Sequence, residues 1–154
     1  IDLRKGYEEI INLFVTKEEK HKYKVIEGKA QDKSLDIGNN FDLVFTSPPY
    51  RGFEEYSKDK SQSMEEFPLL KDWIDGFILG MVDNWIPRIK KGGYFAININ
   101  DPGGNFKGKE AFTVKVVKAI SSDKRLSYKG VIGYAEGTQN KLRLAQPIWI
   151  WKID

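Results

Sequence analysis

Three segments of the chain carry apolar residues at helical spacing and are predicted as helices: Leu3 to Phe14, Leu69 to Ile89 and Phe112 to Ser121. The middle segment is the most regular, because a large apolar residue recurs every fourth position, at Trp73, Phe77, Met81 and Trp85. Pro87 should distort its last turn, and Gly92-Gly93 is predicted to close it as a C-terminal cap.

Short apolar runs bounded by turn residues predict five strands: Lys24 to Glu27, Phe41 to Thr46, Tyr94 to Ile99, Leu126 to Tyr134 and Ile148 to Trp151. Helices and strands alternate until the last two strands, which follow each other directly. The order predicts an α/β fold in a single domain, with a mostly parallel sheet, helices on both faces and a C-terminal antiparallel hairpin at one edge. The polar stretch Arg51 to Pro68 is predicted as a long loop.

Composition excludes several kinds of chemistry. The 154 residues contain no cysteine, which removes disulfides, thiolate metal sites and a cysteine nucleophile. The one histidine, His21, lies in a charged stretch and is interpreted as a surface residue, so no metal site is predicted. The net charge of +3 is weak evidence for a nucleic-acid partner. No apolar run is long enough to cross a membrane and no signal peptide is evident, so we expect a cytoplasmic protein without a membrane partner.

Polar residues stand where predicted strands end, which is where open α/β sheets bind ligands. Gln31-Asp32 follows the strand at Lys24 to Glu27, and Asn100-Asp101 follows the strand at Tyr94 to Ile99. Asp2 precedes the first helix. Its carboxylate is placed either to accept hydrogen bonds from ribose hydroxyls or to cap that helix, and the spacing alone does not decide between the two.

The segment Ser47-Pro48-Pro49-Tyr50, which ends the Phe41–Thr46 strand, is the strongest candidate for chemistry. An exocyclic amine on a base is a poor nucleophile, and acceptors for its hydrogens help its nitrogen become pyramidal. The Ser47 hydroxyl and the Pro48 carbonyl can accept those hydrogens, two prolines fix the backbone, and Tyr50 offers a flat face for stacking. The alternative is a rigid turn after a core strand.

The run Phe41 to Tyr50 resembles the catalytic motif of S-adenosylmethionine-dependent amino-methyltransferases, and the resemblance covers nearly the whole chain. Gly28 to Asp32 resembles the family's cofactor-adenine segment, Ile89 to Gly93 the approach to its fifth strand, and Pro147 to Lys152 its last strand. The resemblance implies a Rossmann-like, seven-stranded methyltransferase fold. It also implies catalytic and cofactor-binding residues: Ser47, Pro48, Pro49 and Tyr50 for catalysis, and Asp2, Gln31, Asp32 and Thr46 for S-adenosylmethionine.

The chain departs from the family pattern because it has no glycine-rich loop of the form Phe-x-Gly-x-Gly. The simplest account is that the chain is a piece whose first strand, first helix and glycine loop lay upstream of Ile1. The exposed sheet edge should then lie near Lys24 to Glu27 and Phe41 to Thr46, and we expect self-association or partial collapse to fill the gap.

A serine at the head of the motif is most typical of enzymes that methylate N4 of cytosine in DNA, so DNA is the expected partner, with adenine N6 as the next target. Arg51, Phe53 and Tyr56 are candidate substrate contacts. Arg51, with Lys58 and Lys60, could contact phosphates, and Phe53 and Tyr56 could lie near a flipped base; the alternative is a solvated loop. Two further interpretations stay open: methylation of an amide or base in protein or RNA, and a non-catalytic remnant that keeps the fold.

Overall fold

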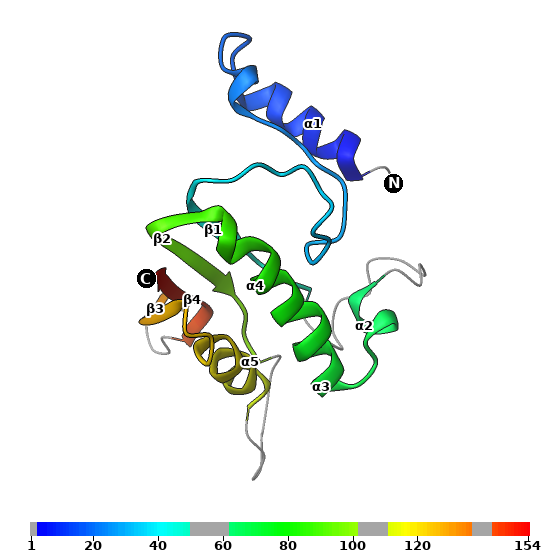
Figure 1. The fold of residues 1–154 in the computed structure, drawn as a ribbon. Coiled ribbons are helices and arrows are strands. Elements are labelled where there is room, and N and C mark those ends of the chain that lie inside the picture. The colour runs from blue at the N-terminus through cyan, green and yellow to red at the C-terminus, as the bar shows by residue number, and fades with distance from the viewer. Residues whose placement is uncertain (1–2, 50–61, 102–110, 137–142) are drawn as a thin grey trace.

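The computed structural model describes residues 3–49, 62–101, 111–136 and 143–154, and it forms one four-stranded mixed sheet with helices (Figure 1). The strands are β1 (Phe41–Thr46), β2 (Ile89–Asn98), β3 (Leu126–Glu136) and β4 (Arg143–Ile153). Their order across the sheet is β1-β2-β4-β3. β1 and β2 are parallel, whereas β4 is antiparallel to both of its neighbours. An α/β fold with a C-terminal antiparallel pair at one edge is therefore confirmed. The prediction of a mostly parallel sheet is wrong for the described residues, because only β1 and β2 run parallel and β4 inserts antiparallel between β2 and β3.

A nearly continuous helical run crosses the sheet, as the four-residue spacing predicted. It comprises α3 (Leu70–Asp72), the π-helical η2 (Trp73–Ile78), α4 (Leu79–Trp85) and the 3₁₀ turn η3 (Ile86–Arg88). Pro87 lies in η3, where the tighter turn replaces the end of the α-helix. α5 (Phe112–Ser121) has the bounds predicted from the sequence.

The core lies between these helices and one face of the sheet. Its largest buried side chains come from η2, α4, β2, α5 and β4: Trp73, Ile78, Met81, Phe95, Ile97, Val116, Ile120 and Trp151. Buried tryptophans need partners for their indole N–H groups. Trp73 donates to Ser63 Oγ at 3.1 Å and Trp151 donates to Ser121 Oγ at 2.9 Å.

Both described covering helices pack on this same face, so the prediction of helices on both faces is wrong for the described residues. Strand residues of the opposite parity, Leu43 and Phe45 on β1 and Tyr94 on β2, stay exposed. The helix α1 (Leu3–Phe14) forms as predicted, but Figure 1 shows it apart from the sheet. Its apolar residues Leu13 and Phe14 face solvent.

Three other predictions are corrected. Lys24 to Glu27 has no regular secondary structure and pairs with no described strand, so it is not part of the sheet. Gly92-Gly93 lies inside β2, because the helical run ends at Arg88 and β2 begins at Ile89. The end of the predicted Arg51–Pro68 loop contains a short helix, α2 (Ser63–Glu66), and residues 50–61 lie outside the described part.

Gly92-Gly93 forms part of a bulge in β2 and is not the predicted helix cap. Phe41 pairs with Ile89 and Leu43 pairs with Tyr94, so β2 carries extra residues opposite β1 and bulges. Gly92 adopts φ +82° there, and a Cβ on Gly93 would lie 2.9 Å from the Asp42 carbonyl oxygen. Both positions therefore favour glycine because of the bulge.

Among the described residues no helix is long and apolar enough to cross a membrane.

Candidate functional site

The turn that leaves β1 is the centre of the candidate site. Thr46 ends the strand half-buried, Ser47 is exposed, Pro48 is buried and Pro49 is half-buried. Proline cannot donate to a sheet ladder, so the two prolines stop the strand at this point. The buried Pro48 fixes the backbone, while the Ser47 side chain is left at the surface.

The carboxyl end of β2 lies beside that of β1, because the two strands are parallel and Thr46 pairs with Ile97. Asn98 and Asn100-Asp101 follow at the same end. Asp101 Oδ1 accepts a hydrogen bond from the Thr113 backbone N–H at 3.0 Å, which binds the first turn of α5. This carboxylate therefore stabilises a helix N-terminus.

The turn that contains Gln31-Asp32 is held against α4 by Asn84 and Trp85. Asn84 Nδ2 donates to the carbonyl oxygens of Ala30 at 2.9 Å and Asp32 at 3.1 Å, and Trp85 Nε1 donates to the Ala30 oxygen at 3.0 Å. These bonds satisfy carbonyls that the turn cannot pair internally. The turn is thus fixed to the same helix that packs under β1.

The Asp32 carboxylate is engaged within its own turn. Its Oδ1 accepts from the Ser34 hydroxyl at 2.7 Å and from the Ser34 backbone N–H at 2.9 Å. Bonds from Ser34, first the hydroxyl and then the N–H, lower the pKa of Asp32 because they favour the charged carboxylate. Oδ2 has no hydrogen bond to a described residue.

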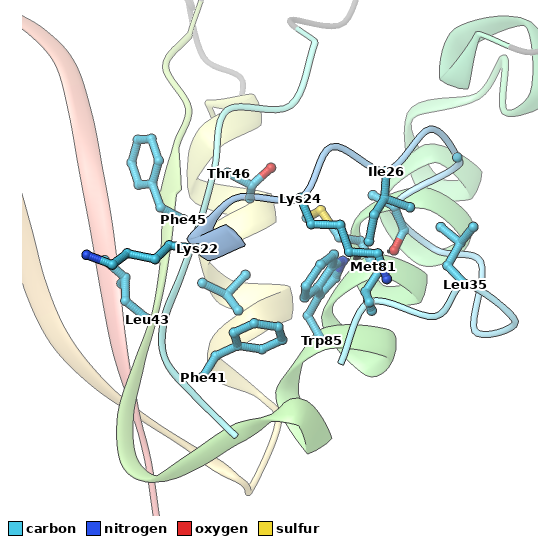
Figure 2. A pocket seen from close by; sticks show the side chains of 14 residues that line it. Lys22, Lys24, Ile26, Leu35, Phe41, Leu43, Phe45, Thr46, Met81 and Trp85 are labelled. Atoms are coloured by element: carbon cyan, nitrogen blue, oxygen red, sulfur yellow. Dashed lines mark hydrogen bonds between the residues drawn. The ribbon is translucent and has the colours of Figure 1, made fainter. Parts of the chain in front are cut away.

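A hollow of about 610 Å³ runs along β1 and reaches Thr46 (Figure 2). Its walls are β1, α4 and the segment 22–37, and it is lined by Lys22, Lys24, Ile26, Gly28, Ala30, Leu35, Ile37, Phe41, Leu43, Val44, Phe45, Thr46, Met81 and Trp85. Apolar side chains form most of this lining. A volume of this size lies within the range of small-molecule sites.

The two lysines at the hollow each have an acidic partner. Lys22 Nζ lies 3.2 Å from Glu19 Oε1, and Lys24 Nζ lies 3.4 Å from Asp36 Oδ2. Lys24 also donates to the Asp36 carbonyl oxygen at 3.0 Å. Because their charges are largely compensated, the lysines do not make the hollow a strong anion site.

The structure brings some of the predicted site residues together. Thr46, Ser47, Pro48 and Pro49 form one turn, and Thr46 lines the hollow together with Ala30, the residue before Gln31. Gln31 and Asp32 belong to the adjoining turn but are not among the lining residues. The remaining predicted site residues lie outside the described part of the chain: Asp2, Tyr50, Arg51, Phe53 and Tyr56, as well as Lys58 and Lys60.

Asn84 is the site residue that the sequence interpretation missed. It is only 3% exposed and joins the Gln31-Asp32 turn to α4. The sequence feature that could have identified Asn84 is its spacing: it comes three positions after Met81 and seven after Phe77, which places a polar amide on the apolar face of a helix. A polar residue on such a face needs a buried partner.

Within the described residues, no group of three or more acidic or histidine side chains could hold a metal ion, and His21 is exposed. No protein-family model matches the chain, and no curated protein matches it.

Proposed function

We propose that this chain transfers a methyl group from S-adenosylmethionine to the exocyclic amino group of a DNA base, with cytosine N4 favoured over adenine N6. The observation that carries the proposal is the turn Ser47-Pro48-Pro49, which has an exposed serine and a buried proline at the carboxyl end of β1. Its likeness to the amino-methyltransferase motif supports the same function. The finer fold assignment, a seven-stranded methyltransferase sheet, belongs to this proposal.

The chemistry follows from two acceptors on a rigid turn. The Ser47 hydroxyl and the Pro48 carbonyl accept hydrogen bonds from the two amine hydrogens, which draws the nitrogen lone pair out of conjugation with the ring. The nitrogen would then bond to the methyl carbon that S-adenosylmethionine supplies, while the sulfur–methyl bond breaks and S-adenosylhomocysteine leaves; the cationic nitrogen would afterwards lose a proton to solvent. Rigid acceptors lower the barrier because they need no reorganisation during the reaction.

The residues beside the turn fit the cofactor in part. S-adenosylmethionine supplies an electrophilic methyl group when bound. Thr46 offers a hydroxyl at the mouth of the hollow, and Asp32 keeps one carboxylate oxygen free of described partners for the amino group of the cofactor's adenine. Gln31 offers an amide on the same turn. Thr46, Gln31 and Asp32 would therefore hold the cofactor, together with Asp2.

A methyl-transfer assay on DNA tests the role of Ser47. We expect Ser47→Ala to lower the transfer rate by about 10²-fold, because loss of one preorganised hydrogen-bond partner has an effect of that order. Ser122→Ala, at an exposed serine after α5, is the matched control and should keep the full rate. Unchanged transfer in Ser47→Ala would show that the assignment is wrong. Parallel assays on RNA and protein distinguish the alternative substrates.

One observation favours the non-catalytic remnant as a second candidate. The Asp32 carboxylate already accepts two hydrogen bonds from Ser34, so one of its two oxygens is occupied within its own turn and is less available for the proposed contact with the cofactor's adenine. Calorimetric titration with S-adenosylmethionine separates the two candidates. Binding supports the enzyme, whereas a titration without heat at millimolar cofactor supports the remnant.

A further inference from the structure

β1 is an edge strand with one open side. It pairs with β2, and no described segment pairs with its other edge. An unpaired strand edge presents a row of free N–H and C=O groups, which form a template for another extended chain. The feature that distinguishes this edge is the hollow that lies along it (Figure 2).

The far wall of the hollow is chain without regular secondary structure. Residues 24–28 have no helix or strand partner, and no backbone hydrogen bond links them to β1. Ile26 lines the hollow from this wall, and Phe41 and Val44 line it from β1. The two walls are thus held apart by a space that neither of them fills.

The size of the space corresponds to a short strand. A strand in a packed sheet occupies about 160 Å³ per residue, from a spacing of about 4.8 Å between strands, about 10 Å between layers and a rise of about 3.3 Å. The hollow of about 610 Å³ therefore holds roughly four residues. Its lining favours apolar side chains, because Met81 and Trp85 line it from α4 and Phe41 and Val44 line it from β1.

The opposite edge of the sheet, at β3, is irregular and resists pairing with a further strand. Added strands should therefore pair at the β1 edge. β3 has two register shifts, between Tyr128 and Gly130 and between Ile132 and Tyr134, and Gly130 adopts φ +133°. Irregular edges of this kind resist further pairing. β1 has a single irregularity near its start, and its pairs from Leu43 to Thr46 are regular.

We propose that the groove between β1 and residues 24–28 binds an extended apolar peptide segment, which adds to the sheet as a strand beside β1. Main-chain hydrogen bonds to the open edge supply affinity, and the apolar walls select valine-like side chains at the alternate positions that face them. The lysines at the groove are paired with acids, so the segment needs no charge of its own. The proposal does not rest on methyltransferase activity.

The probe is a dye-labelled, end-capped octapeptide with four central valines flanked on each side by serine and glutamate, and binding is followed by fluorescence anisotropy. We expect Ile26→Asp to weaken binding at least about tenfold, because it places a charge in the groove. Ile132→Asp is the matched control, since Ile132 is an exposed isoleucine on β3 away from the groove, and it should change the affinity less than about twofold.

Backbone pairing is tested with two versions of the peptide that are N-methylated at alternate residues, in opposite phase. Because successive N–H groups of a strand point to opposite sides, at least one version should bind about tenfold more weakly than the parent peptide. Absence of binding by the parent, or equal binding by all three peptides, overturns the proposal. A chain that light scattering shows to be a dimer and that rejects the peptide also overturns it, in favour of a second copy in the groove.

Discussion

At the scale of single residues, Asn84 links two parts of the candidate site. Its amide donates to the Ala30 and Asp32 carbonyls, and its backbone oxygen accepts from Arg88 Nε at 3.2 Å. The turn residues Thr46 to Pro49 could be predicted from the sequence, because a double proline after an apolar run signals its own strand end. Asn84 could not, since its partners are backbone atoms more than fifty positions away in the chain.

We expect Asn84→Ala to lower the free energy of unfolding by about 2 kcal/mol, because two carbonyl oxygens lose their amide donor in a largely buried place. Urea denaturation measures this effect. Asn12→Ala, at an exposed position of α1, is the control and should change stability by less than about 0.5 kcal/mol. Equal effects of the two substitutions would contradict the linking role of Asn84.

Acid should weaken the fold through aspartates that are paired in the native state. Hydrogen bonds from Arg125 lower the pKa of Asp123, and hydrogen bonds from Lys33 and then Arg125 lower the pKa of Asp83. A carboxylate whose pKa is lowered by folding adds stability above its unfolded value, near 3.8, and that stability is lost as the pH falls through the lower folded value.

Asp123→Asn should therefore be less stable than the parent chain at pH 7, by about 0.5 to 1 kcal/mol. The difference should shrink as the pH falls from about 4 to about 2, because the parent carboxylate becomes protonated. Urea midpoints measured across this pH range test the expectation. Asp36→Asn, at a side chain that is 95% exposed, is the control, and a constant difference across the range would count against the prediction.

At the scale of elements, local periodicity was enough to predict the helices α1 and α5 but not to predict every strand. α1 and α5 have the predicted bounds because each helix satisfies its hydrogen bonds within itself. The run Lys24 to Glu27 has strand-like residues but no partner, and a strand exists only as part of a pair. The β2 bulge was missed for the same reason, since it is defined only by its pairing with β1.

Alanine substitutions at two glycines, one in the β2 bulge and one inside α1, should change stability in opposite directions. Gly92 adopts φ +82° in the β2 bulge, and Gly92→Ala should lower the free energy of unfolding by about 1 to 2 kcal/mol. Gly6 lies inside α1 with open space around it, and Gly6→Ala should raise helix content because alanine favours helices by up to about 1 kcal/mol. Thermal unfolding and circular dichroism measure the two effects. A Gly92→Ala chain as stable as the parent would show that the positive φ is not required.

At the scale of the whole molecule, apolar surface is left uncovered on two separate features. The sheet face opposite the core exposes Leu43, Phe45 and Tyr94, and α1 exposes Leu13 and Phe14. Contiguous apolar surface of this kind promotes association. The sequence predicted an open sheet edge near β1. It could not predict which face of the sheet stays exposed, because that depends on how both covering helices pack and periodicity carries no information about it.

We expect the average mass of the chain in sedimentation velocity to rise with concentration. The double variant Leu13→Lys and Phe14→Lys should reduce that rise, because it replaces the exposed apolar end of α1 with charge. Ser122→Lys, which adds a charge at an exposed residue after α5, is the control and should leave the rise largely unchanged. A constant monomer mass for the parent chain at all concentrations would contradict this expectation.

The position of β4 sets the order in which the sheet can be assembled. β4 follows the other described strands in the sequence, yet it lies between β2 and β3. During synthesis, β3 has no neighbour in the sheet until β4 has been made, and β2 has only β1. The centre of the sheet therefore closes last, by insertion of β4. Nascent chains that stop before residue 143 should expose the edges of β2 and β3 that β4 otherwise covers, and these edges invite binding by chaperones.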